Sequence, residues 1–378
     1  MQIAVPREID PGEKRVAIIP KTVERLVKKG ATVLVESGLG LTCHYKDEEY
    51  LKAGAKVETD RKALLSSSDL VLRLRKPVLD EIALLKKGAI HVSYLDPFNE
   101  KALIEAFVKA GVSAISMEMI PRTSRAQKMD ALSSQASLGG YVAVILASER
   151  INKIFPMMMT PAGTISPARV FIVGAGVAGL QAIATAKRLG ARVEAFDTRP
   201  VVEEQVKSLG AKFVKIDLGE TGQTQGGYAK QLSQEQLEKQ RQGMMKICAV
   251  SDVLITTAQV FGRKAPVIIT KDMLDQMKAG SVVVDMAVET GGNVEGSLVD
   301  QEVLTDNGVL LIGMGNLPGR VAVNASEMFS SNLFSLIDEF WNNDAFKLNL
   351  DDEIIKGCLI THQGHIVNPT IKKTTDAS

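Results

Sequence analysis

The chain has 378 residues, which is enough for two ordinary domains with sizeable cores. Hydrophobic residues make up 45% of the chain and charged residues 24%, a balance typical of globular proteins. The formal net charge of +1 leaves no electrostatic footprint for nucleic acid or for an anionic membrane surface, so we expect neither as a direct partner.

The sequence shows no targeting or metal-binding signal. Three scattered cysteines without CxxC spacing argue against a zinc site or a disulfide framework and suit a reducing cytosol. The four histidines are isolated or lie in the tail, so no metal site is predicted. The N-terminus has no basic stretch followed by an apolar run, and the longest apolar stretch, near residues 141–147, is far shorter than a membrane span.

Strand and helix patterns alternate from the start of the chain to about residue 118. Helical patterns such as residues 21–29 and 100–110 end at Gly30 and Gly111, as helices with glycine C-caps do. The β-rich runs between them cover residues 3–5, 32–35, 70–74, 90–95 and 114–117. Strands separated by helices predict a parallel sheet covered on both faces.

A polar segment over residues 121–141 separates this pattern from a second one, and a long helix is predicted over residues 139–152. The second pattern begins at Ala168 and again alternates strands with helices. Its predicted strands begin at residues 168, 192, 212, 253, 281 and 309. A stretch rich in Gly, Gln and Thr runs from residue 217 to residue 227 and is too long for a simple turn.

The tail contains a predicted amphipathic helix over residues 325–341 and a hairpin over residues 359–367 that turns at Gln363 and Gly364. We expect the tail to return to the first domain. The sequence therefore predicts two α/β domains, residues 1–138 plus 325–378 and residues 139–324.

A glycine motif stands at the start of the second pattern. Gly174, Gly176 and Gly179 follow a predicted strand directly and open a helix. In dinucleotide-binding folds, the first glycine makes the tight turn, the second lets the backbone approach a pyrophosphate, and the third allows close helix–strand packing. The helix N-terminus would present N–H groups and a positive dipole end to the phosphates. The alternative is a simple glycine turn, but the motif has its strand and its helix.

An acidic residue, Asp197, ends the next predicted strand, 18 residues after Gly179. A carboxylate there can accept both ribose hydroxyls and would repel a 2′-phosphate, which favours NAD over NADP. Arg199, two residues further on, weakens this preference slightly. The alternative is a solvated aspartate that caps a loop.

The polar segment contains four side chains with no obvious core role: Arg122, Gln127, Asp130 and Ser133. Arg and Asp could pair, and Gln and Ser could hydrogen-bond a carboxamide, near the junction where nucleotide clefts form. A polar loop that leads into a helix is an equally good interpretation. Tyr228 could close over a nucleotide as a lid, although an ordinary mobile loop is the simpler interpretation.

The chain resembles the NAD(H)-binding alpha subunits of proton-translocating nicotinamide nucleotide transhydrogenases along its whole length. The specific motifs are RVAIIP (residues 15–20), PRTSRAQKMDALSSQ (121–135), FPMMMTPAGT (155–164), GAGVAGLQAIATAKRLGA (174–191), GGYAK (226–230) and VDMAVETGGN (284–293). The resemblance implies two Rossmann-like domains with parallel sheets and the NAD site in the cleft between them.

The resemblance also implies residue roles. The catalytic group that orients the dihydronicotinamide would be Arg122, Gln127, Asp130 and Ser133. The cofactor-binding residues would be Arg122, Gln127, Leu132, Ser133, Gly174, Ala175, Gly176, Val177, Gly179, Asp197, Thr198, Arg199, Gly227, Tyr228, Gln240 and Gln259. Asp197, Thr198 and Arg199 would hold the adenosine ribose, and Tyr228 would form the tip of a mobile loop.

The expected activity is that of a Re/Si-specific NAD(P) transhydrogenase, which passes a hydride between NADH and NADP⁺ on a partner subunit. The resemblance implies a homodimer, an NADP(H)-binding beta subunit and membrane-spanning subunits that translocate protons. The chain would be cytoplasmic and peripheral on the inner (plasma) membrane through these partners.

Alanine dehydrogenase shares this architecture and is the alternative. Amino-acid oxidation needs a general base beside the nicotinamide and cations for the substrate carboxylate. Asp96 stands where that family has a histidine, Glu289 where it has an aspartate, and Arg75 where it has a lysine, whereas Arg15 matches. Hydride transfer between two nicotinamides needs no acid or base, only ring alignment and exclusion of water. A third hypothesis is a redox-sensing NAD-binding module.

Overall fold

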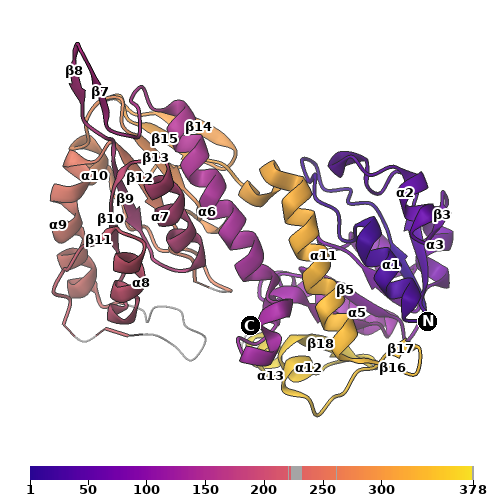
Figure 1. Cartoon of the computed structure of the whole chain (residues 1–378). Helices are drawn as coiled ribbons and strands as arrows, with labels where there is room; N and C mark the ends of the chain where they lie inside the picture. The colour runs from indigo at the N-terminus through magenta and orange to yellow at the C-terminus, as the bar shows by residue number, and fades with distance from the viewer. Residues whose placement is uncertain (220, 223–231, 261, 377–378) are drawn as a thin grey trace. The chain divides into compact units, whose positions relative to one another are not determined.

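The computed structural model describes residues 1–219, 221–222, 232–260 and 262–376. They form two compact units: unit 1 comprises Met1–Gln135 and Gly319–Ser378, and unit 2 comprises Ala136–Pro318 (Figure 1). Each unit is built around a mostly parallel β-sheet with helices, which confirms the predicted α/β class. The domain limits predicted from the sequence stay a prediction.

Unit 1 contains an eight-stranded sheet in the spatial order β19-β18-β6-β5-β4-β1-β2-β3. The six strands β1 to β6 are parallel, and their order 3-2-1-4-5-6 is that of doubly wound dinucleotide-binding folds. The antiparallel hairpin β18–β19 extends this sheet beside β6. The strands are β1 (Gln2–Val5), β2 (Thr32–Glu36), β3 (Lys56–Glu58), β4 (Leu70–Leu72), β5 (Ile90–Ser93), β6 (Ser113–Ser116), β18 (Leu359–His362) and β19 (His365–Ile366).

The two faces of this sheet carry separate cores, because successive strand residues point to opposite faces. Ile3 and Leu70 pack with α1, α11 and α12, whereas Ala4 and Val71 pack with α3, α4 and α5. The helices of unit 1 are α1 (Pro20–Lys28), α2 (Asp47–Lys52), α3 (Arg61–Ser67), α4 (Leu79–Ile82), α5 (Lys101–Ala110), α11 (Ala322–Glu339), α12 (Glu353–Cys358) and α13 (Pro369–Asp376).

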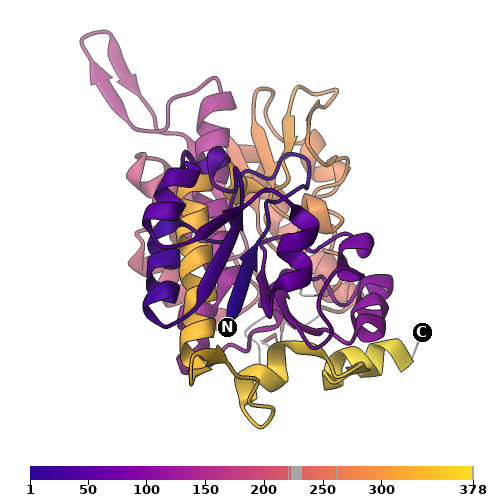
Figure 2. The ribbon, with the colours of Figure 1, turned by 90° about the vertical axis from the view of Figure 1, so that its right-hand side faces the viewer.

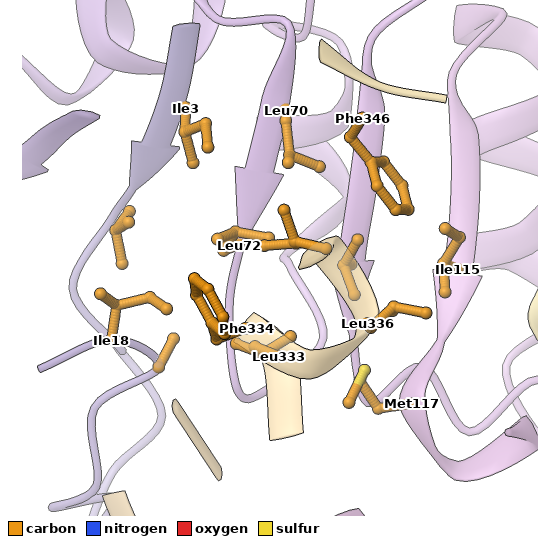
Figure 3. Packing of buried hydrophobic residues seen from close by; sticks show 14 of the residues in the cluster. Ile3, Ile18, Leu70, Leu72, Ile115, Met117, Leu333, Phe334, Leu336 and Phe346 are labelled. Atoms are coloured by element: carbon orange, nitrogen blue, oxygen red, sulfur yellow. The ribbon is translucent and has the colours of Figure 1, made fainter. Parts of the chain in front are cut away.

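Helix α11 completes the first of these cores. Its Leu333, Phe334 and Leu336 lie against strand side chains that include Leu72 and Ile115 (Figure 3). The helix runs beside α1 in both ribbon views (Figures 1 and 2). A segment from the C-terminal end of the chain therefore supports the sheet of unit 1.

Unit 2 contains a seven-stranded sheet in the order β11-β10-β9-β12-β13-β15-β14. All strands are parallel except β14, which pairs antiparallel with β15 and was not predicted. The strand order reverses between β9 and β12, which is the switch point where doubly wound sheets bind ligands. The strands are β9 (Arg169–Val173), β10 (Arg192–Phe196), β11 (Lys212–Phe213), β12 (Val253–Thr256), β13 (Val282–Asp285), β14 (Gln301–Leu304) and β15 (Leu310–Gly313).

The helices of unit 2 are α7 (Val177–Arg188), α8 (Glu203–Ser208), α9 (Gln234–Val250) and α10 (Lys271–Asp275), and α6 (Ala131–Arg150) begins in unit 1 and continues into unit 2. The prediction that the long helix begins at residue 139 was wrong, because Asp130 caps a helix that begins eight residues earlier. Among the described residues, only α6 has the length and composition of a membrane span. Half of that stretch is buried, and core helices pass the same test.

Candidate nucleotide site

The turn between β9 and α7 gives three glycines separate steric roles. Gly174 has a φ of +98°, and a Cβ there would lie 2.4 Å from Thr257 Oγ1. A Cβ on Gly179 would lie 1.9 Å from the Gly174 carbonyl oxygen, so only glycine lets α7 approach β9 this closely. A Cβ on Gly176 would meet its nearest atom, Arg199 Nη2, at 3.9 Å. The turn is therefore tight at its first and third glycines and open at its second.

The N-terminus of α7 is open to a ligand in a second respect. Its N-cap is Gly176, and no side chain caps the helix. The first N–H groups and the positive end of the helix dipole suit a phosphate there. On the side of unit 2 where α6 passes, a Cβ on Gly140 would lie 2.1 Å from the Ala178 carbonyl oxygen, so a glycine of α6 allows close packing on this turn.

Asp197 follows β10 and accepts hydrogen bonds from four donors. Oδ2 accepts from the Ala175 N–H and from Arg199 Nη2, both at 2.7 Å. Oδ1 accepts from the main-chain N–H of Arg199 at 2.8 Å and from its Nε at 2.9 Å. The ion pair is largely buried, with 5% of the Asp197 side chain and 14% of the Arg199 side chain exposed. The hydrogen bond to Asp197 raises the pKa of Arg199 above its ordinary value.

The loops that follow β12 and β13 are fixed by two polar residues that the sequence analysis did not single out. Asp285 is buried and accepts from the N–H groups of Ala287 and Asn293, both at 2.9 Å, and burial raises its pKa. Asn293 in turn bonds both main-chain groups of Ala258, as acceptor at 3.0 Å and as donor at 2.8 Å. An aspartate directly after the buried run VVV was the available signal, because that end of the strand lies at the switch edge.

The polar segment of unit 1 forms a short 3-10 helix, η3 (Ser124–Met129), and the first turn of α6. Asp130 and Ser133 are brought together: the Ser133 Oγ donates to Asp130 Oδ2 at 2.6 Å, and its N–H donates to Oδ1 at 2.9 Å. Asp130 is thus the cap of α6. Arg122 and Gln127 are exposed, and Leu132 is half-buried.

Side chains from the C-terminal region of unit 1 hold this segment. The Asn332 side chain of α11 donates to the Lys128 carbonyl oxygen at 3.0 Å and accepts from Ser134 Oγ at 2.7 Å. Arg125 pairs with Asp352 at 2.5 Å, and the Lys128 ammonium pairs with Glu339 at 2.8 Å. The segment that the sequence suggested as a solvated loop is therefore anchored on both sides of Asp130.

A buried charge cluster lies at the other end of the segment. Glu13 binds Arg15 through both carboxylate oxygens, at 2.8 and 2.7 Å, and binds Arg75 Nε at 2.8 Å. Arg15 also donates to Gln135 Oε1 at 2.8 Å. Burial alone would raise the pKa of Glu13, but the hydrogen bonds and charge of Arg15, with the charge of Arg75, lower it to about 2.

The remaining predicted cofactor contacts are spread over unit 2. Val177 is exposed on the first turn of α7, and Thr198 is half-buried between Asp197 and Arg199. Gln240 is buried in α9, whereas Gln259 is exposed after β12 and donates to the Met286 carbonyl oxygen at 3.1 Å. Gly227 and Tyr228 lie outside the described residues.

The residues of unit 2 fit a dinucleotide. The open Gly176 and the uncapped N-terminus of α7 suit a pyrophosphate, and Asp197 lies next to that turn through its bond to Ala175. A carboxylate has about four acceptor positions. Those of Asp197 are filled by protein donors, so a ribose hydroxyl could bind there only in exchange for one of them.

Two family models match the chain. "Alanine dehydrogenase/PNT, N-terminal domain" matches residues 4–139, and "Alanine dehydrogenase/PNT, C-terminal domain" matches residues 143–369. The chain is 44% identical to a separately encoded piece of the NAD(P) transhydrogenase alpha subunit of Rhodospirillum rubrum, over 98% of this chain and 99% of that protein.

A solved structure of a transhydrogenase from Sinorhizobium meliloti matches with a TM-score of 0.87 and 43% identity, over 97% of this chain and 100% of that one. Alanine dehydrogenase of Bacillus subtilis is 28% identical, over 99% of this chain and 94% of its own length. The family resemblance that the motifs indicated is thereby confirmed. The chain belongs to the alanine dehydrogenase/PNT family, with the transhydrogenase alpha subunit as the more similar of these relatives.

Proposed function

We propose that this chain is the NAD(H)-binding subunit of a proton-translocating transhydrogenase and exchanges a hydride with NADP(H) on a partner subunit. The observation that carries the proposal is the 44% identity to a transhydrogenase alpha subunit over nearly the whole of both chains, against 28% to an alanine dehydrogenase. The name of that relative, a subunit, supports partner chains, which we propose to be an NADP(H)-binding beta subunit and membrane-spanning subunits at the cytoplasmic face of the membrane.

In this proposal, unit 2 binds the pyrophosphate at Gly174, Gly176 and Gly179 and the adenosine ribose at Asp197. The group Arg122, Gln127, Asp130 and Ser133 orients the dihydronicotinamide. NADH supplies the hydride. Direct transfer to a second nicotinamide leaves no proton to take up or release, so alignment and exclusion of water are the catalytic requirements.

The surroundings of Arg15 support this function over amino-acid oxidation. Glu13 is bonded to both Arg15 and Arg75, so the charge of each arginine is already compensated in part. Asp96, at the turn after β5, has a φ of +51°, and its N–H donates to the buried Glu118 at 2.5 Å. The turn thus carries an exposed carboxylate where alanine dehydrogenase would need its histidine.

We also propose that two copies of the chain form a dimer through the hairpin of β7 (Met158–Thr160) and β8 (Gly163–Ile165). The hairpin projects from unit 2 (Figure 2), and all residues of both strands are exposed, including 73% of Met159. An isolated two-stranded hairpin is marginally stable in water, and exposed apolar side chains mark interaction sites. A second copy that covers the methionines would remove both costs.

The function is tested by assaying the purified chain with two sets of substrates. We expect hydride exchange between NADH and an NADP⁺ analogue when a purified NADP(H)-binding partner is added, and no exchange without that partner. The same preparation is then given NADH, pyruvate and ammonia.

Alanine formation at a useful rate would contradict the proposal and establish alanine dehydrogenase, which the 28% relative makes the alternative. NADH binding without activity in either assay would favour the sensing module. A Gly176→Ala variant, run in parallel, controls for activity from a contaminating enzyme.

A further inference from the structure

We propose that Arg199 is an exchange residue of the NAD(H) site: it holds Asp197 through its guanidinium and releases it to the adenosine ribose while the guanidinium turns to the pyrophosphate. This inference rests on the proposed NAD(H) binding and adds a residue role to it.

The first step is the saturation of Asp197. Four donors reach its two oxygens at 2.7 to 2.9 Å, and three of them come from Arg199. A carboxylate offers about four acceptor positions, so none is left over for a ribose hydroxyl. A ribose diol that binds Asp197 must therefore replace existing donors.

The second step identifies the donors that can leave. The N–H of Ala175 belongs to the glycine turn, and the N–H of Arg199 belongs to the backbone after β10, so neither can move without a change of the fold. The Nε and Nη2 donors sit on a flexible side chain. Two ribose hydroxyls can replace these two donors, one at each carboxylate oxygen.

The third step concerns where the guanidinium goes. Its Nη2 lies 3.9 Å from the position of a Cβ on Gly176, so it borders the open side of the turn at the N-terminus of α7. A pyrophosphate at that turn would lie within a side-chain rotation of the guanidinium. Guanidinium and phosphate make strong, often bidentate hydrogen bonds, which would offset the ones lost to Asp197.

The exchange predicts opposite effects on two ligands. An Arg199→Ala variant lacks the guanidinium at the pyrophosphate, so we expect its Kd for NADH to rise about tenfold, the value of one charge-assisted hydrogen bond. Adenosine has a ribose but no phosphate. Since Asp197 is already free of the guanidinium in this variant, we expect its Kd for adenosine to fall about threefold.

Calorimetry with NADH and ligand-observed NMR titration with adenosine measure the two constants, and circular dichroism checks the fold of each variant. Arg199→Lys is the matched control, since it keeps the charge but cannot form the fork and should lie between the wild type and Arg199→Ala for NADH. In Asp197→Ala, the adenosine gain from removing Arg199 should vanish.

Weaker or unchanged adenosine binding by Arg199→Ala would overturn the inference, and so would unchanged NADH binding. If Arg199→Ala does not fold, the Arg199→Lys constants decide by the same signs. A wild-type chain that binds neither ligand would instead refute the proposed function, so the two failures are distinguishable.

Discussion

The glycine turn of unit 2 and the polar segment of unit 1 are held in shape by different means. The glycine turn is shaped by the main chain, because Gly174 and Gly179 leave no room for side chains. The polar segment is shaped by side chains, because Asp130 caps α6 and Asn332 ties the segment to α11. Each region contains an aspartate whose carboxylate is engaged by protein donors.

The partners of the two aspartates show what each region can do. Asp197 is bonded to a cationic side chain that can move to another anion, whereas Asp130 is bonded to the N–H and hydroxyl of Ser133 in the first turn of a helix. An N-cap leaves its helix only at a cost of about 1 kcal/mol. The first region therefore suits reversible binding, and the second suits fixed orientation of a bound group.

The largest expected effect separates two glycines of the same turn. In Gly179→Ala, the new Cβ would lie 1.9 Å from a carbonyl oxygen, so we expect a loss of about 3 kcal/mol or more in unfolding free energy. In Gly176→Ala, the Cβ meets nothing within 3.9 Å, so stability should be unchanged while the Kd for NADH rises about tenfold or more. Thermal unfolding and calorimetry measure both.

A loss of stability in Gly176→Ala would show that this glycine, too, serves packing. Unchanged NADH binding by that variant would contradict the pyrophosphate site itself.

The next effect tests whether Asp130 does more than cap α6. Asparagine caps helices as well as aspartate does, so Asp130→Asn should keep the melting temperature and the NADH affinity. If the carboxylate orients the nicotinamide, hydride transfer with the partner subunit should fall about 100-fold, the cost of a misplaced reacting group. Single-turnover kinetics measure this step.

Asp130→Ala is the matched variant, since it should also lose about 1 kcal/mol of stability with the cap. Normal hydride transfer in Asp130→Asn would leave this aspartate a purely structural role.

A smaller effect is expected at Asn332, which acts as a positioning residue through Lys128 and Ser134. Asn332→Ala removes both bonds, and the loosened segment should lower hydride transfer about tenfold at unchanged NADH affinity. Asn324→Ala, an exposed position of the same helix, controls for loss of an asparagine from α11. Equal losses in transfer for the two variants would contradict the positioning role.

The two regions also differ in how far the sequence could predict them. Glycine spacing after a strand predicts the turn, because the steric roles of Gly174 and Gly179 depend only on local main-chain geometry. The strand pattern predicted the doubly wound sheets for the same reason. The polar segment depends on Asn332, about 200 positions away, and no local pattern indicates that contact. The saturation of Asp197 depends on the rotamer of Arg199, which the sequence leaves open.

The smallest effect tests whether charge holds the polar segment from its other end. Glu13 binds Arg15, which binds Gln135, and its pKa is lowered from an ordinary 4.5 to about 2. Between these two values the unfolded chain binds a proton that the folded chain does not, so stability falls as the pH falls through this window. Glu13→Gln should be less stable than the wild type at pH 7, and the gap should shrink by roughly 1 kcal/mol at pH 3.5. The exposed Glu48→Gln serves as control. A gap that stays constant with pH would mean that packing, not charge, holds this end, and would bring the polar segment closer in kind to the glycine turn.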